Sequence, residues 1–368
     1  RRHTRYPLVT GVQTCALPIF HPARIGGDEF AVLISDVSAE EALVLGRRIC
    51  EALAAPYAFD DVVANVSASL GLATWPDHGV GATQLYERAD FTLYHCKQND
   101  RGTVQMFHPE HEAIMREDAR IERALQRADL AGELSVVFQP VVSLSADAPV
   151  AWEALARWTG VELGAIPPAR FIASAERSDL IFRLTRLLLR KTLDLVDALP
   201  AGGRVSFNLS PREVTTPGAV AQLLAIVEAS GVAPARIDFE VTETALLRDF
   251  DRAVESLSMI RAFGCGVVLD DFGAGHSDLG RLHRLPLDKV KIDRALVRET
   301  DGDPRALRIL RAMIEMCGHL GFACVIEGVE TEAQLERLRD LGCDLFQGYL
   351  FGAPAQLVAP APPIADVA

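Results

Sequence analysis

The sequence lacks the marks of several protein classes. No apolar run approaches the ~18 residues that a membrane-spanning helix needs, and the N-terminus has no signal-peptide pattern. Seven cysteines are scattered along the chain, at Cys15, Cys50, Cys96, Cys265, Cys317, Cys324 and Cys343. None of them has C-x-x-C spacing. Scattered cysteines without such pairs are typical of proteins in a reducing compartment. We therefore expect a soluble, cytoplasmic chain with no membrane contact of its own, while a longer parent protein with an upstream anchor stays open.

Positive charge is scarce as well. The chain has 37 Lys and Arg against 50 Asp and Glu, a net charge of -13. Such a chain does not attract a polyanion through its overall field, so we expect no DNA or RNA partner, and a nucleotide ligand needs local cations. With 49% hydrophobic and 24% charged residues, the composition excludes wholesale disorder. The 368 residues suffice for two to three domains of about 150 residues each, unless one is a large α/β barrel.

The first third of the chain mixes short strands and helices. From Arg24, the stretch RIGGDEFAVLIS predicts a Gly-Gly turn leading into an apolar strand, and residues 62–76 are rich in β-forming residues. Helices are predicted at residues 39–54 and 83–97. Residues 111–130 predict a connecting helix, because their apolar residues form a single stripe.

Beyond residue 130 the pattern changes to strands that alternate with helices. Eight β-like runs are predicted, at residues 134–142, 151–158, 204–209, 236–242, 266–271, 289–293, 323–327 and 345–351. Amphipathic helices separate most of them, at residues 180–199, 218–230, 250–263, 304–320 and 332–341. Roughly 225 residues of alternating β and α structure predict a TIM-like (β/α)8 barrel, whose usual length is about 250 residues. Only the first two runs lack room for a helix between them, so we expect the first strand to be antiparallel.

Polar residues stand at the end of every predicted strand. They are Gln139, Glu153, Asn208, Glu240, Asp270 with Asp271, Lys291, Glu327 and Gln347. In barrels of this kind the carboxyl ends of the strands form the active-site rim, so we expect these side chains to converge. Any one of them is as readily a helix cap or a solvated strand end. Their recurrence on all eight strands favours a site.

The charges of this rim point to divalent cations. Five carboxylates face Lys291 and Arg157, and these acids are Glu153, Glu240, Asp270, Asp271 and Glu327. At ~4 Å and an effective dielectric near 20, each like-charge contact costs about 4 kcal/mol, so either several carboxylates are protonated or metal ions bind. Oxygen ligands without His or Cys favour Mg²⁺ or Mn²⁺.

Two readings of the chemistry follow from this rim. The adjacent Asp270 and Asp271 suit a bridge between two ions, and two ions about 3.5 to 4 Å apart are typical of phosphodiester hydrolysis. The rival is a barrel enzyme with one Mg²⁺, of enolase or aldolase type, in which Lys291 acts as a base or forms a Schiff base. That rival leaves most of the carboxylates unused.

Ordered motifs give the second half of the chain a family resemblance. Residues 153–158, EALARW, resemble the signature of the EAL family, the phosphodiesterases of cyclic di-GMP. Further similar stretches are FQPVV around Gln139, NLS at Asn208, FEVTET from Phe239, DDFGAG from Asp270, KID at Lys291, EGVET from Glu327 and QGYLFG from Gln347. The resemblance covers about residues 115–358.

The resemblance implies a role for each matched residue. One Mg²⁺ or Mn²⁺ ion would be held by Glu153, Asn208, Glu240 and Asp270, and a second by Asp270, Asp271 and Glu327. The catalytic group would comprise Lys291, which orients the attacking water, Glu327, and Glu243, which tethers the loop after Asp271. The substrate would be lined by Gln139, Leu155, Arg157, Asp293 and Gln347. The resemblance also implies a homodimer through the EAL domain. We further expect Ca²⁺ to inhibit, because its longer bonds and looser coordination would spread the two-metal geometry.

Two positions depart from the EAL pattern. His276 stands where an aromatic residue is usual, and Asp278 stands where a small residue is usual. Both lie in the loop after Asp271, so they leave the metal ligands untouched and would affect regulation or rate.

The first part of the chain resembles the GGDEF family of diguanylate cyclases. The motif GGDEF at residues 26–30 and the stretches SASLGLATWP and ERADFTLYHCKQNDRG carry this resemblance, which covers about residues 23–108. A complete GGDEF domain has further residues upstream with a second metal-binding Asp. Asp28 alone cannot assemble the two-metal site of a cyclase, so we predict a truncated, inactive domain. The inhibitory Arg-x-x-Asp is also missing, since Leu17 and Phe20 occupy its places.

We accordingly expect five segments. They are residues 1–22, hypothesised to be foreign sequence, a partial GGDEF domain at 23–110, a connecting helix at 111–130, an EAL domain at 115–358 and a tail at 359–368. The expected function is metal-dependent hydrolysis of cyclic di-GMP to linear pGpG. The alternative is a cyclic di-GMP-binding sensor or scaffold without catalysis, although degenerate members of that class lack the EAL glutamate or several ligands that this chain has.

Overall fold

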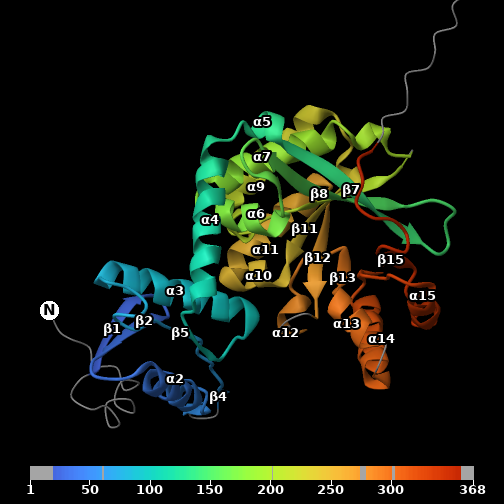
Figure 1. Ribbon diagram of the computed structural model, residues 1–368. Coiled ribbons are helices and arrows are strands. Elements are labelled where there is room, and N and C mark those ends of the chain that lie inside the picture. Colours follow the sequence, from blue (N-terminus) through green and yellow to red (C-terminus); the bar gives the residue numbers. More distant parts are fainter. Residues whose placement is uncertain (1–19, 60–61, 201, 274–278, 301–302, 358–368) are drawn as a thin grey trace, which may run out of the picture. The chain divides into compact units, whose positions relative to one another are not determined.

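The computed structural model describes residues 20–59, 62–200, 202–273, 279–300 and 303–357 (Figure 1). They divide between residues 119 and 120 into two compact units. No helix within the described ranges is both long and apolar enough to cross a membrane. The predictions for most of residues 1–22, for His276 and Asp278, and for the tail at 359–368 lie outside the described residues.

The described part of the first unit contains short strands, two helices of its own and the start of a third. Strands β1 (Phe20–Gly26) and β2 (Glu29–Ile34) form an antiparallel hairpin, β3 (Tyr57–Phe59) pairs with β4 (Val62–Ala64), and β5 (Leu70–Leu72) runs parallel to β6 (Val104–Met106). The helices are α2 (Ala39–Leu53) and α3 (Ala82–Asn99). The predicted turn before β2 is present, at Gly27 with a φ of 50°. The sequence pattern did not reveal β1, which begins ahead of the expected domain start.

The second unit is a closed eight-stranded barrel, as predicted. Its strands are β7 (Leu134–Ser143), β8 (Ala151–Gly160), β10 (Arg204–Asn208), β11 (Ile237–Thr242), β12 (Gly266–Phe272), β13 (Lys289–Ile292), β14 (Ala323–Ile326) and β15 (Leu345–Gln347). Strand β7 is antiparallel to both neighbours, β15 and β8, and the other strands run parallel. The prediction of an antiparallel first strand is confirmed. A short strand, β9 (Gly164–Ile166), extends β8 as a hairpin.

Helices cover the outside of the barrel (Figure 1). The main ones are α6 (Pro168–Glu176), α7 (Leu180–Leu193), α9 (Pro217–Ser230), α11 (Phe250–Phe263), α14 (Pro304–His319) and α15 (Glu332–Arg339). Shorter helices follow several strands, at α8 (Pro211–Val214), α10 (Glu243–Arg248), α12 (Leu279–Leu282) and α13 (Arg294–Glu299). Apolar strand residues that face outward, such as Phe207 and Phe239, are buried under these helices and form the core.

Several element boundaries differ from the predicted ones. The helix expected at 180–199 ends at Leu193, and a 3-10 turn at Val196–Ala198 follows. The connecting helix is α4 (Pro109–Arg127), followed by the short α5 (Leu130–Glu133). The last strand ends at Gln347, because the chain then turns across the backbone of Val329. A Cβ atom at Gly348 would lie 2.0 Å from the Val329 carbonyl oxygen, so only glycine fits there.

The barrel interior carries a lower polar layer that the sequence analysis missed. Asp238 of β11 is fully buried and pairs with Arg204 of β10 and, at 2.5 Å, with Nζ of Lys289 of β13. Burial opposes ionisation of Asp238, but these two cations lower its pKa below the usual value. Gly266 of β12 makes room, since a Cβ there would lie 1.9 Å from Asp238 Oδ1.

Candidate active site

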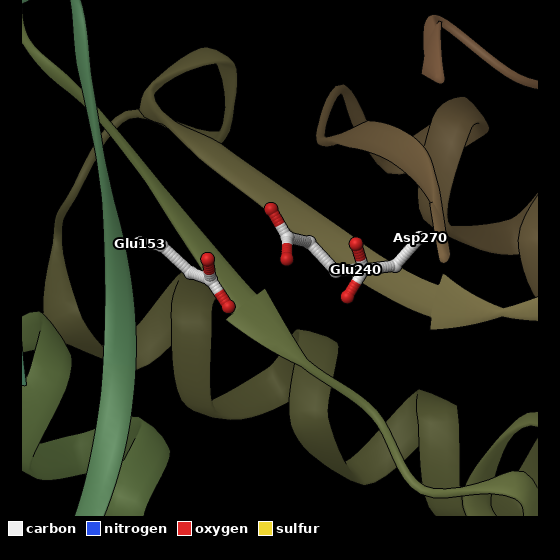
Figure 2. Close-up of side chains that lie close together, drawn as sticks. All are labelled: Glu153, Glu240 and Asp270. Atoms are coloured by element: carbon white, nitrogen blue, oxygen red, sulfur yellow. The ribbon is translucent and has the colours of Figure 1, made fainter. Parts of the chain in front are cut away.

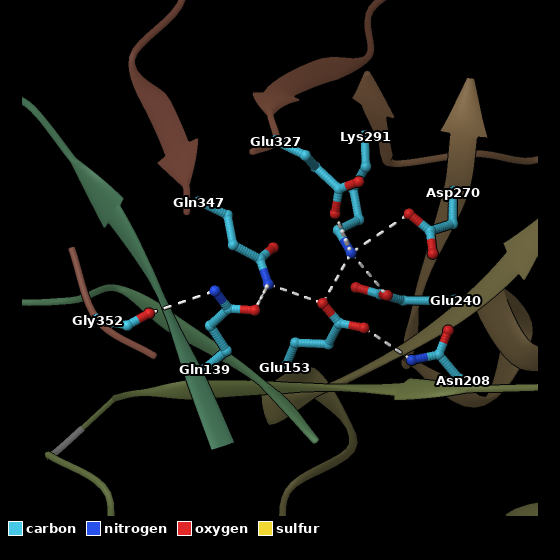
Figure 3. Close-up of polar contacts among 9 residues, drawn as sticks. All are labelled: Gln139, Glu153, Asn208, Glu240, Asp270, Lys291, Glu327, Gln347 and Gly352. Atoms are coloured by element: carbon cyan, nitrogen blue, oxygen red, sulfur yellow. Dashed lines mark hydrogen bonds and ion pairs between the residues drawn. The ribbon is translucent and has the colours of Figure 1, made fainter. Parts of the chain in front are cut away.

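The polar strand ends converge on one lysine. Lys291 Nζ lies 3.0 Å from Glu153 Oε2 and 3.0 Å from Glu240 Oε2 (Figure 3). It also lies 3.3 Å from Asp270 Oδ1 and 2.6 Å from Glu327 Oε1. The lysine is 2% exposed. Four carboxylates from four elements thus share one buried cation at the carboxyl end of the parallel strands.

Strand alternation explains why these side chains point inward. Side chains two residues apart on a strand share a face. On β13, Lys289 belongs to the lower layer and Lys291 to the site; on β11, Asp238 and Glu240 are related in the same way. Parallel register then places Asn208 of β10 directly beside Glu240.

Asp270 and Asp271 depart from this alternation. They are sequence neighbours, which in a regular strand would point to opposite faces, yet carboxylate oxygens of both lie within 4.8 Å of one from Glu327. The backbone explains the difference. Asp271 has a φ of 56°, and the pairing of β12 with β13 shifts register between Leu269 and Phe272. A bulge of this kind re-aims a side chain next to a site.

The donor set fits two divalent cations. One group of carboxylates comprises Glu153, Glu240 and Asp270, which extend from three different strands (Figure 2). A second group comprises Asp270, Asp271 and Glu327. These groups contain every carboxylate of the two predicted ligand sets. The remaining predicted ligand, Asn208, donates from Nδ2 to Glu153 Oε1 at 2.9 Å. Carboxylate and amide oxygens are ligands suited to Mg²⁺ or Mn²⁺.

Burial and mutual repulsion shift the pKa values of the cluster. Burial raises the pKa of Glu240 well above its ordinary value, and burial with the neighbouring acids raises that of Glu327 to about 7. Burial and the charge of Asp270 raise the pKa of Asp271 to about 6. For Glu153 burial acts against ionisation, but Lys291 and hydrogen bonds from Asn208 and Gln347 lower its pKa. One lysine therefore does not neutralise the cluster, which takes up protons or further cations.

Two glutamines join the cluster on one side. Gln347 Nε2 donates to Glu153 Oε2 at 2.7 Å and to Gln139 Oε1 at 3.3 Å. Gln139 Nε2 donates to the carbonyl oxygen of Gly352 at 3.2 Å (Figure 3). Among the described residues no donor reaches the buried Oε1 of Gln347. That atom is available to accept a hydrogen bond from a ligand.

Sequence reasoning missed the backbone contact that brings these glutamines together. The amide of Phe138 donates to the carbonyl oxygen of Ala355 at 2.7 Å, and the amide of Ala355 donates back to Phe138 at 3.0 Å. The segment after β15 thus returns to β7 and presents Gly352 to Gln139. No local pattern reports such a pairing, because it joins residues more than 200 positions apart.

The other predicted site residues lie around the cluster with different partners. Leu155 and Arg157 share the inward face of β8 with Glu153 and are partly buried, and Arg157 Nη1 donates to the carbonyl of Ala156 at 2.8 Å. Asp293 caps α13 by accepting from the amide of Ala295 at 2.7 Å. Each of the three therefore stays a prediction as a substrate contact.

Glu243 also stays a prediction. It begins α10, three residues after Glu240. The loop that it is predicted to tether lies mostly at residues 274–278, outside the described residues.

Comparison with known proteins places this geometry in a family. Residues 122–354 match the family described as EAL domain, and residues 15–103 match the diguanylate cyclase GGDEF domain. The chain is 37% identical over 340 residues to an uncharacterized signaling protein of Caulobacter vibrioides, covering 92% of this chain and 42% of that protein. It is 33% identical over 341 residues to the cyclic di-GMP phosphodiesterase NbdA of Pseudomonas aeruginosa, covering 92% of this chain and 44% of NbdA. The chain thus spans less than half the length of these relatives.

A solved structure resembles the barrel unit. The PaMucR phosphodiesterase in complex with c-di-GMP superposes with a TM-score of 0.60 and 33% sequence identity, covering 64% of this chain and 98% of that one. The fold found from the chain's own strands is therefore shared with a solved phosphodiesterase.

Proposed function

Because the chain belongs to the EAL domain family, preceded by a GGDEF domain, we propose that it hydrolyses one phosphodiester bond of cyclic di-GMP to give linear pGpG. The observation that carries the proposal is the complete acidic cluster around Lys291 at the carboxyl end of the barrel. Phosphodiesterase relatives, among them NbdA and PaMucR, support the same reaction. The enolase-type and aldolase-type readings are disfavoured, because they leave most of these carboxylates without a role.

The proposed ligands are those of the two groups described above. Bound Mg²⁺ or Mn²⁺ would supply Lewis acidity and lower the pKa of a coordinated water. The chain's own part is to hold the reacting groups. Lys291 stays protonated, because four carboxylates raise its pKa against the effect of burial. An ammonium group donates hydrogen bonds only, so we assign Lys291 to orienting the attacking water through its oxygen lone pair.

The substrate would lie beside the glutamines and β8. Arg157 supplies a local cation for a phosphate, which the chain's net charge of -13 does not provide, and Leu155 offers an apolar surface to a base. The free acceptor on Gln347 suits an N–H or O–H of the nucleotide. Gln139 and Asp293 are assigned to the surround of the substrate, and Glu243 to the loop after Asp271.

We also propose that the GGDEF part has no cyclase activity. Asp28 lies exposed in the turn between β1 and β2, and attack on GTP by this family needs a two-metal site. A homodimer through the barrel is expected from family resemblance, and light scattering on the purified chain would test it.

The deciding experiment is incubation of the purified chain with cyclic di-GMP and either Mg²⁺ or Mn²⁺, followed by chromatography. We expect pGpG with at least one metal, and none from Glu153→Ala. Glu336→Ala, which removes an exposed glutamate of α15, is the matched control and keeps wild-type turnover. Binding of cyclic di-GMP without any product under either metal would establish the sensor alternative instead.

A further inference from the structure

The N-terminus of helix α4 has an unusual cap. In a capping box, Ser or Thr precedes the helix and Glu or Gln follows three positions later. The side chain of each residue accepts a hydrogen bond from the backbone N–H of the other. Here His108 precedes Pro109, the first residue of α4, and His111 occupies the third helical position. Two histidines therefore stand where non-titrating or acidic acceptors are usual.

Both imidazoles accept hydrogen bonds from the backbone. The amide of His108 donates to Nδ1 of His111 at 3.2 Å. The amide of Glu110 donates to Nδ1 of His108 at 3.5 Å. A backbone N–H can only donate, so Nδ1 of His111 carries a lone pair and its ring proton is on Nε2. A protonated imidazole has N–H groups at both positions and cannot accept either bond.

His111 is also enclosed by the first unit. It is 9% exposed. Its ring lies 4.7 Å from the ring of His95 and 5.9 Å from that of Phe91, both on α3, and 5.6 Å from the ring of Phe107. A positive charge on His111 would therefore be partly desolvated, and it would also remove the hydrogen-bond acceptor of the cap.

The charges around His111 are mixed. Several groups disfavour a positive charge on His111. They are His95 and Arg88 of α3, His108, and His78, which packs on Phe107. The acidic groups are Asp77 beside His78, and Glu110 and Glu112 of α4 itself. Glu112 is already paired, at 3.1 Å with Arg88 and at 2.7 Å with Arg116. The positive end of the helix dipole adds to the cationic side.

These contacts set the direction of the pH effect. Burial, followed by the neighbouring His95 and His108, lowers the pKa of His111. A histidine whose pKa is depressed in the folded protein contributes its stability above about pH 6.5, the ordinary value for the free side chain, and loses it as the pH falls through the folded value.

We propose that His111 is a pH-sensitive cap of α4, which holds the first turn at neutral pH by accepting from the His108 amide and releases it on acidification. Helix α4 runs from residues of the first unit into residues of the second, where Ile121 and Leu125 are each 1% exposed in the barrel core. Release of the first turn shortens α4 at its N-terminal end and leaves the rest of the helix in place. This inference does not depend on the proposed catalytic function.

Hydrogen exchange of the full chain measured by mass spectrometry tests the proposal. After correction for the intrinsic pH dependence, amides at the start of α4 should lose protection by about fivefold between pH 7.5 and pH 5.5, the change expected when a typical helix cap is lost. In the double variant His108→Ser, His111→Gln the loss should disappear, because serine and glutamine accept the same bonds without titrating. His319→Gln, at the end of α14, is the control and keeps the wild-type response.

An equal loss of protection in wild type and double variant would overturn the proposal. So would a wild-type chain without any such loss. A second measurement needs no variant. Nitrogen chemical shifts of the imidazoles at pH 7.5 should report the Nε2–H tautomer for His111, and the Nδ1–H tautomer would rule out the cap.

Discussion

Gly266→Ala is predicted to destabilise the barrel through the lower polar layer. The new Cβ would lie 1.9 Å from Asp238 Oδ1 and 2.9 Å from Arg204 Nη2. No side chain tolerates the first distance, so the carboxylate must move away from Arg204 and Lys289. Asp238 has no exposed surface, so the displacement breaks a buried ion pair.

The expected cost follows from that broken pair. Loss of one partner from a buried ion pair costs about 3 to 5 kcal/mol. For a domain of 150 to 250 residues, about 1 kcal/mol corresponds to a change in Tm of roughly 2 to 4 °C, so we expect the barrel transition to fall by about 6 °C or more.

A double-mutant cycle separates this cause from a general effect of alanine. Asp238→Ala should itself lower the Tm, because it leaves Arg204 and Lys289 without their acceptor. In that background Gly266→Ala should cost little, since the space is vacated. Gly218→Ala, in α9 with nothing within 4 Å of the new Cβ, is the matched control and should not lower the Tm. Equal costs of Gly266→Ala with and without Asp238 would refute the reasoning.

Three further predictions concern other parts of the barrel. Gly348→Ala should abolish turnover, because the new Cβ would lie 2.0 Å from the Val329 carbonyl oxygen and push the strand end with Gln347 away from Glu153. Chromatography of the reaction products checks this, and a fully active variant would contradict it. Burial raises the pKa of Glu213 to about 7, so the wild-type protein loses stability as the pH rises through 7. Between pH 5 and pH 8.5, the free energy of unfolding of Glu213→Gln, measured in urea, should therefore rise by about 3 kcal/mol relative to that of wild type. A parallel pH dependence in both proteins would exclude that cause. Replacing Mg²⁺ or Mn²⁺ by Ca²⁺ should inhibit turnover, because Ca²⁺ binds oxygen ligands at longer distances with looser geometry, and product formation at the Mg²⁺ rate would contradict the two-metal assignment.

The sequence by itself determined the architecture of the second unit. Each of the eight predicted runs contains a strand, since short apolar runs separated by amphipathic helices have one efficient way to bury their surfaces. The missing helix between the first two runs sufficed to predict an antiparallel β7. The candidate site was also predictable as a set, because parallel strands bring their carboxyl ends to one rim.

Tertiary structure alone decided how those residues meet. The pairing of Lys291 with four carboxylates depends on distances across the barrel, which no local period encodes. The positive φ of Asp271 overrides strand alternation and turns two adjacent acids toward Glu327. The lower layer of Asp238 with its two cations depends on a glycine in the neighbouring strand. Sequence periodicity reports the face on which a residue lies, whereas its partner is set by register, bulges and packing between segments far apart in the chain.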